Sequence, residues 1–114
     1  MAVSTMVHDS TDGRYRHEET VADASTSDPV LMPSVQHHDP YMKPVVVYVS
    51  PAGGGSAKIE QTISSPADVA AGSAVWSPWA LGEVSVPTSH ALWAPMTALR
   101  CVSVNGATFW SALR

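Results

Sequence analysis

The chain has 114 residues, a formal net charge of −4 and a single cysteine, which limits it to one domain without an internal disulfide framework. Its lysines and arginines form no basic patch, which argues against nucleic-acid binding. The longest apolar run, VVVYV, is far shorter than the roughly 20 residues that a membrane helix needs. Since the N-terminus also lacks the apolar segment of a secretion signal, we expect a protein made in the cytoplasm, with no membrane partner.

Residues 1–44 are expected to form an extended acidic arm. They contain seven acidic and three basic residues and show neither a 3.6-residue nor a 2-residue apolar period, which is typical of a segment without its own core. One short apolar patch lies before Pro33 and is a candidate anchor on a neighbouring chain. It consists of Val30, Leu31 and Met32.

Residues 45–114 have the pattern of an all-β domain. Short runs of β-branched and aromatic residues alternate with Pro, Gly, Asn and Ser, and no stretch keeps a helical period over the ten or so residues of a typical helix. This part carries six charged side chains in 70 residues, whereas roughly a quarter of the residues are charged in an average globular chain. We therefore predict a small antiparallel β-sandwich or barrel-like domain, preceded by the extended arm and partly covered by other subunits.

The glycine-rich stretch SPAGGGSAKIEQTIS, residues 50–64, has one feature of a phosphate-binding loop, namely a strand followed by glycines and a lysine. Lys58 is nevertheless out of register, no Ser or Thr follows it, and the next residues alternate as in a strand instead of opening a helix. We interpret residues 53–55 as a hairpin connection between strands at 43–50 and 56–64, exposed or at a neighbour contact.

The C-terminal segment predicts a second hairpin. Residues 65–73 first indicate a turn or one helical turn, and residues 74–96 indicate short extended pieces broken by prolines. Asn105 and Gly106 then form the dipeptide preferred where two consecutive residues need positive φ. A two-residue turn there pairs Val104 with Ala107 and leaves both hairpin faces apolar, which places the hairpin inside a sandwich.

Candidate catalytic and metal-binding residues are few. Ser89 and His90 lack the G-x-S-x-G elbow of a hydrolase, and Cys101 lies in an apolar strand, where cysteine behaves as a small hydrophobe. His37 and His38 are neighbours on an extended chain, so their side chains point apart and do not chelate one metal easily. We predict no enzyme, no metal site and no cofactor.

Large apolar side chains point to assembly. A domain of about 70 residues buries only roughly 60% of its unfolded surface, so we expect a homo-oligomer and favour a trimer. Four tryptophans are candidates for the core and the subunit interface: Trp76, Trp79, Trp93 and Trp110. The first three are alternatively a flat platform for a sugar or peptide. Arg100, alone on an apolar strand, is a rim residue or an ion-pair partner across subunits.

The last part of the chain resembles short virion structural proteins of tailed bacteriophages. The resemblance covers roughly the final 40 residues, SPWALGEVSVPTSHALWAPM followed by TALRCVSVNGATFWSALR, and its motif is Pro95, Thr97, Ala98, Leu99, Arg100 and the turn at Asn105 and Gly106. It implies a non-enzymatic virion protein, preferably a capsid decoration or cement protein that bridges major capsid subunits on the capsid surface. A tail or adaptor component and a small carbohydrate- or peptide-binding β-module are the alternatives.

Overall fold

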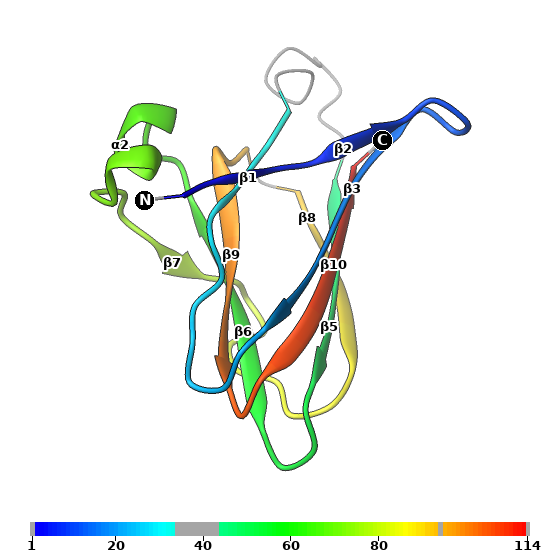
Figure 1. Ribbon diagram of the computed structural model, residues 1–114, viewed down its shortest axis with the longest axis vertical. Helices are drawn as coiled ribbons and strands as arrows, with labels where there is room; N and C mark the ends of the chain where they lie inside the picture. The colour runs from blue at the N-terminus through cyan, green and yellow to red at the C-terminus, as the bar shows by residue number, and fades with distance from the viewer. Residues whose placement is uncertain (1, 34–43, 94, 114) are drawn as a thin grey trace.

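The computed structural model describes residues 2–33, 44–93 and 95–113, which form two five-stranded sheets (Figure 1). Sheet A has the order β1 (Ser4–Thr5), β4 (Val30–Leu31), β9 (Ala98–Val104), β6 (Ser56–Thr62) and β7 (Ser77–Pro78). Sheet B has the order β2 (Val7–Asp9), β3 (Arg14–Val21), β10 (Ala107–Leu113), β5 (Val45–Pro51) and β8 (Thr88–Leu92). Only β1 and β4 pair in parallel. The predicted all-β sandwich is confirmed.

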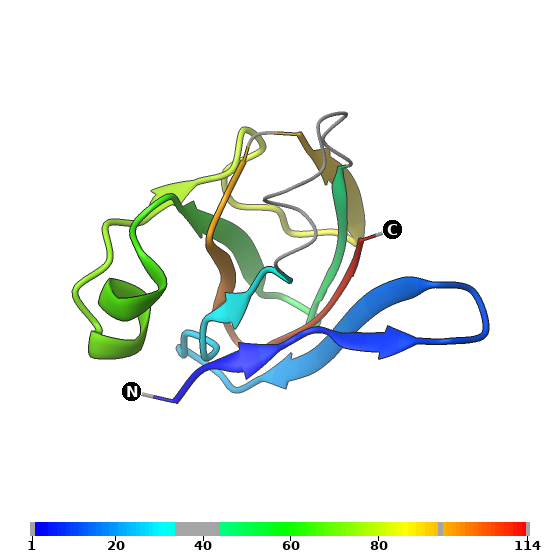
Figure 2. The ribbon, with the colours of Figure 1, turned by 90° about the horizontal axis from the view of Figure 1, so that it is seen from above.

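The core lies between the two sheets, which form opposite walls of the molecule in Figure 2. Successive side chains of a strand point to opposite faces, so every second residue of the long strands faces inward. The fully buried side chains include Val45, Val47 and Val49 of β5, Ile59 of β6, Leu99 and Cys101 of β9, and Phe109 and Leu113 of β10. Among the described residues, no helix is both long and apolar enough to cross a membrane.

The segment expected to be an arm is part of both sheets, so that expectation is wrong for the described residues of 1–44. β3 pairs along its length with β10 and places Val21 in the core, while β4 pairs with β9 and buries Val30. Composition is misleading here because the inward positions of β3 include polar residues. His17 and Glu19 face inward and contact each other at 3.0 Å between Nε2 and Oε1, which lowers the cost of enclosing them.

The Asn105–Gly106 turn has the predicted backbone conformation but joins different strands from those expected. Both residues have positive φ, 68° and 88°. However, β9 belongs to sheet A and β10 to sheet B, so the predicted pairing of Val104 with Ala107 does not form. In a flat hairpin the apolar rows of Leu99 and Phe109 would lie on opposite faces. Crossing between the sheets turns both rows toward one core.

The glycine-rich loop makes the same kind of crossing, so the hairpin predicted there is also wrong. Residues 52–55 lead from β5 in sheet B to β6 in sheet A. The two crossings touch, because the Asn105 side-chain amide donates a hydrogen bond to the Gly54 carbonyl at 3.3 Å and Gly55 is buried against Val104. Residues 53 and 54 are exposed, as expected.

The helical turn expected at residues 65–73 is present as α2 (Pro66–Ala71). Ser65 caps its N-terminus by accepting a hydrogen bond from the Asp68 N–H at 3.2 Å, and Gly72 ends it with a φ of 79°. α2 lies at the opposite side of the molecule from β5 and β8 (Figure 1).

Candidate interaction surface

The outer face of sheet B carries a patch of exposed apolar side chains in two adjacent cross-strand rows. The strand register defines both rows. The first, called the Trp110 row, is Glu18, Trp110, Tyr48 and Ser89, on β3, β10, β5 and β8. The second, called the Ala112 row, is Val7, Arg16, Ala112, Val46 and Ala91, on β2, β3, β10, β5 and β8.

The Trp110 row forms a raised aromatic ridge, whereas the Ala112 row is low at its centre. The rings of Tyr48 and Trp110 lie 5.2 Å apart between centroids and are tilted by 57°, within the range of favourable aromatic pairs. Beside them is a hollow of about 440 Å³, lined also by Val7, Arg16 and Val46. Because Val7 is 70% exposed and the hollow is open, the face offers a ridge and a depression side by side.

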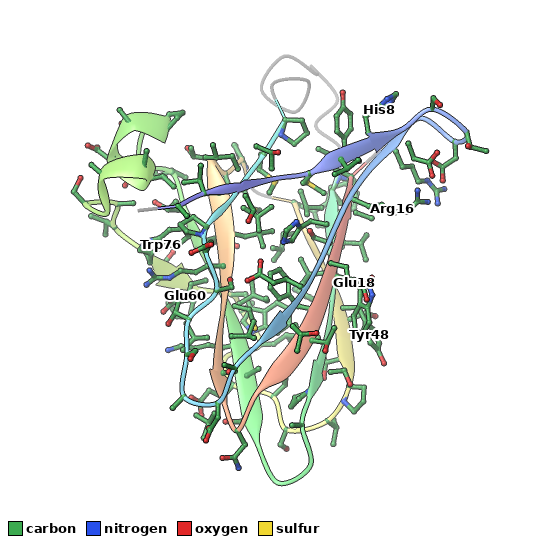
Figure 3. All side chains as sticks on the ribbon, viewed as in Figure 1. His8, Arg16, Glu18, Tyr48, Glu60 and Trp76 are labelled. Atoms are coloured by element: carbon green, nitrogen blue, oxygen red, sulfur yellow. The ribbon has the colours of Figure 1, made fainter. Side chains whose placement is uncertain are left out.

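The β2–β3 hairpin projects beyond the sheet and forms the charged edge of this patch (Figure 2). Arg16 contacts Asp9 at 3.1 Å and is also paired with Asp12. The pKa of Asp12 is lowered mainly by the hydrogen bond from the Arg16 side chain, and that of Asp9 mainly by hydrogen bonding to the Thr11 backbone N–H. Both carboxylates therefore stay ionised at neutral pH and hold the guanidinium at the rim. Figure 3 shows Arg16, Glu18 and Tyr48 along this side.

Several residues predicted to lie at an interface are in the core instead. Val30 is fully buried, Met32 and Trp79 are nearly so, and Leu31 is half-buried. The Trp79 ring packs edge-on against His90 and its indole N–H donates to the Gly82 carbonyl. These side chains stabilise the monomer and are not free to contact another chain.

Arg100 and Trp76 form a cluster within the chain on the outer face of sheet A. The Arg100 side chain contacts the Glu60 carboxylate at 2.7 and 2.8 Å and lies over the Trp76 ring at 4.3 Å. The predicted ion pair of Arg100 is therefore intramolecular in this structure. Since the guanidinium covers one face of the Trp76 ring, that ring does not present both of its faces to a ligand. Glu60 and Trp76 lie on the sheet A side in Figure 3.

The inner face of sheet B holds a polar group that sequence reasoning missed. Ser111 is directly opposite His17 in the register, is buried, and its Oγ has no hydrogen-bond partner among the described residues. Cys101 faces the same interior from sheet A. Burial raises the pKa of its thiol to about 12, with a further contribution from the Glu19 carboxylate. The thiol is therefore protonated at neutral pH and is a poor nucleophile.

The other predicted chemical candidates do not come together. Ser89 and His90 are consecutive on β8, so Ser89 faces outward beside Tyr48 whereas His90 packs against Trp79. Within residues 2–33, 44–93 and 95–113, no three His, Cys, Asp or Glu side chains are placed to share a metal ion. His37 and His38 lie outside these ranges.

A second exposed apolar surface lies at the end of β6, beside α2. Ile63 is 82% and Val75 79% exposed, and both line a shallow hollow with Thr62. The Thr62 hydroxyl donates to the Val75 carbonyl at 2.7 Å and joins the two segments. Since Ile63 follows sheet A, this surface is separate from the patch on sheet B.

Three residues of the sheet B patch, Val7, Val46 and Tyr48, were not identified from the sequence. A signal was present for two of them, because VVVYV is apolar at every position. Once the alternate residues Val45, Val47 and Val49 fill the core, Val46 and Tyr48 must lie on the outer face. A strand that is apolar on both faces therefore indicates either a second buried layer or a contact with another protein.

Comparison of the chain with protein-family models, with curated proteins and with solved structures finds no match.

Proposed function

We propose that this chain is a non-enzymatic structural protein of a virion, preferably a capsid decoration or cement protein. The observation that carries the proposal is the apolar ridge and hollow on the outer face of sheet B, formed around Trp110, Tyr48 and Ala112. Contiguous exposed apolar surface of this kind marks protein contacts, and tryptophan and tyrosine are enriched where binding energy is concentrated. The resemblance to phage virion proteins supplies the particle.

A protein that bridges others needs more than one contact surface, and the chain offers two. The sheet B patch and the surface of Ile63 and Val75 belong to opposite layers of the sandwich. In addition, residues 45–114 have only six charged side chains, and depletion of charge is typical of the buried centre of an interface. Both features support a module that adds contact area between larger proteins.

The test is to ask whether the protein is part of a particle. A lysate in which the natural gene is expressed is separated by density-gradient centrifugation, and each fraction is probed with an antibody raised against the chain. We expect the protein to sediment with intact heads, and gold-labelled antibody to mark the capsid surface. Labelling of tails would favour the tail or adaptor alternative. A protein that stays in the unsedimented fraction while particles form would refute the proposal.

A small binding module is the second candidate, and one observation favours it. Trp93 is 61% exposed and lines a small hollow of about 200 Å³ with His90 and Gln61. A single exposed ring with polar neighbours is suited to stacking on a sugar. Titration with oligosaccharides, followed by tryptophan fluorescence, tests this candidate. It predicts a saturable signal that disappears in Trp93→Ala and persists in Trp110→Ala.

A further inference from the structure

The outer face of sheet B is complementary to itself. Trp110 and Ala112 are two residues apart on β10, so the ridge and the hollow lie only about 7 Å from each other along the strand. Each row also carries one charged side chain on β3, Glu18 beside Trp110 and Arg16 beside Ala112. A large side chain thus alternates with a small one, and a negative charge with a positive one, between the same two rows.

We infer that this face binds a second copy of the chain in a twofold symmetric, face-to-face dimer. The inference rests on the proposed function and names the partner of its main surface. The twofold axis lies between the two sheets, parallel to the rows and midway between them. Rotation by 180° about this axis places the Ala112 row of one copy over the Trp110 row of the other, strand over equivalent strand.

This arrangement matches both shape and charge. Trp110 of each copy lies over the Ala112 hollow of the other, and Tyr48 lies over Val46. At the edge, Glu18 of each copy lies over Arg16 of the other, so two opposite-charge contacts form for each dimer. An isologous interface requires such reciprocal contacts, in which residue i meets residue j and j meets i.

The size of the face predicts a dimer that dissociates on dilution. Five strands of about seven residues cover roughly 24 by 24 Å, or about 600 Å² for each copy, from standard strand spacing and rise. The resulting total of about 1,200 Å² is at the lower end of specific interfaces. The predicted trimer does not follow from this geometry, because a face that pairs with itself closes after two copies.

The experiment is sedimentation equilibrium of the purified full chain over a wide concentration range. We expect the mass to rise from one to two chains with concentration. Trp110→Ala removes a central aromatic anchor and is expected to raise the dimer Kd at least tenfold. Glu18→Arg puts like charges over each other and is expected to raise Kd more than Glu18→Gln does.

Val104→Ala is the matched control, because Val104 is an exposed apolar residue on the outer face of sheet A. It should leave Kd unchanged, and circular dichroism verifies that every variant is folded. Glu18→Arg keeps the test informative if Trp110→Ala does not fold, since Glu18 is exposed. A wild-type monomer at all concentrations, a trimer, or a dimer insensitive to both substitutions would overturn the inference.

The two proposals fail in different ways. A monomer in solution that is nevertheless found in virions refutes the dimer but leaves the virion proposal intact. A dimer with the expected response to Glu18→Arg that is absent from particles refutes only the virion proposal.

Discussion

Gly55 is the position where a single added methyl group should do most damage, because it lies where the two crossings between the sheets touch. A Cβ built there lies 2.2 Å from the Val104 carbonyl oxygen and 2.9 Å from the Asn105 Cβ. Carbon and oxygen normally stay about 3.3 Å apart even in close contacts. One crossing must therefore move by about 1 Å away from the other.

The expected loss in the free energy of unfolding for Gly55→Ala follows from two terms. Overpacking costs about 1–3 kcal/mol. Separation of the crossings also weakens the hydrogen bond from Asn105 to Gly54, whose net value is about 0.5–1.5 kcal/mol. The sum is a destabilisation of about 2–4 kcal/mol, a large part of the roughly 5–15 kcal/mol available to a typical domain.

Residue 53 provides a matched control two positions away in the same loop. A Cβ at Gly53 meets no atom within 4 Å and its φ is not positive, so Gly53→Ala should be neutral or stabilise by up to about 1 kcal/mol through the unfolded state. Urea unfolding at one fixed protein concentration measures both variants. Equal midpoints for Gly53→Ala and Gly55→Ala would refute the interlocked crossings.

Three further predictions concern other parts of the fold. The free energy of unfolding should fall as pH rises from 9 toward 12, because the Cys101 thiol has a folded pKa of about 12 against an ordinary value of 9.0, so the unfolded chain ionises first; Cys101→Val, compared by urea unfolding across this range, should fall less. Arg100→Lys should cost about 1 kcal/mol, since lysine replaces neither the contacts to Glu60 nor the stacking on Trp76, whereas an unchanged melting temperature would contradict this. Ser65→Ala should cost about 1 kcal/mol by removing the cap of α2, with Ser65→Asp expected to retain most of the stability.

Local features of the fold were predictable because they depend on few neighbouring residues. The alternation of β5, the positive φ at Asn105 and Gly106, and the short helix after Ser65 all follow from side-chain and backbone preferences over a few positions. The burial of Cys101 also follows, since it lies in an apolar strand.

Pairing between distant strands was not predictable from the same preferences. The inner residues of β9 and β10 fit a hairpin equally well, and only their need to share one core separates the two arrangements. β3 was missed because its inward side includes His17 and Glu19, which look solvated until they are seen to contact each other. The sheet B patch was partly missed because its rows combine residues from five separate strands.

The central place of β10 in sheet B has a consequence for when the protein can fold. β10 lies between β3 and β5 and is the strand to which the polar β3 is bonded over its full length. In the growing chain, β3 leaves the ribosome roughly 90 residues before its partner, as the register of Ala107 with Val21 shows. Sheet B therefore closes only after synthesis has passed residue 113, and closing such long loops makes folding slow. Until then the apolar β5 is exposed, and a growing chain is at its greatest risk of aggregation in that interval.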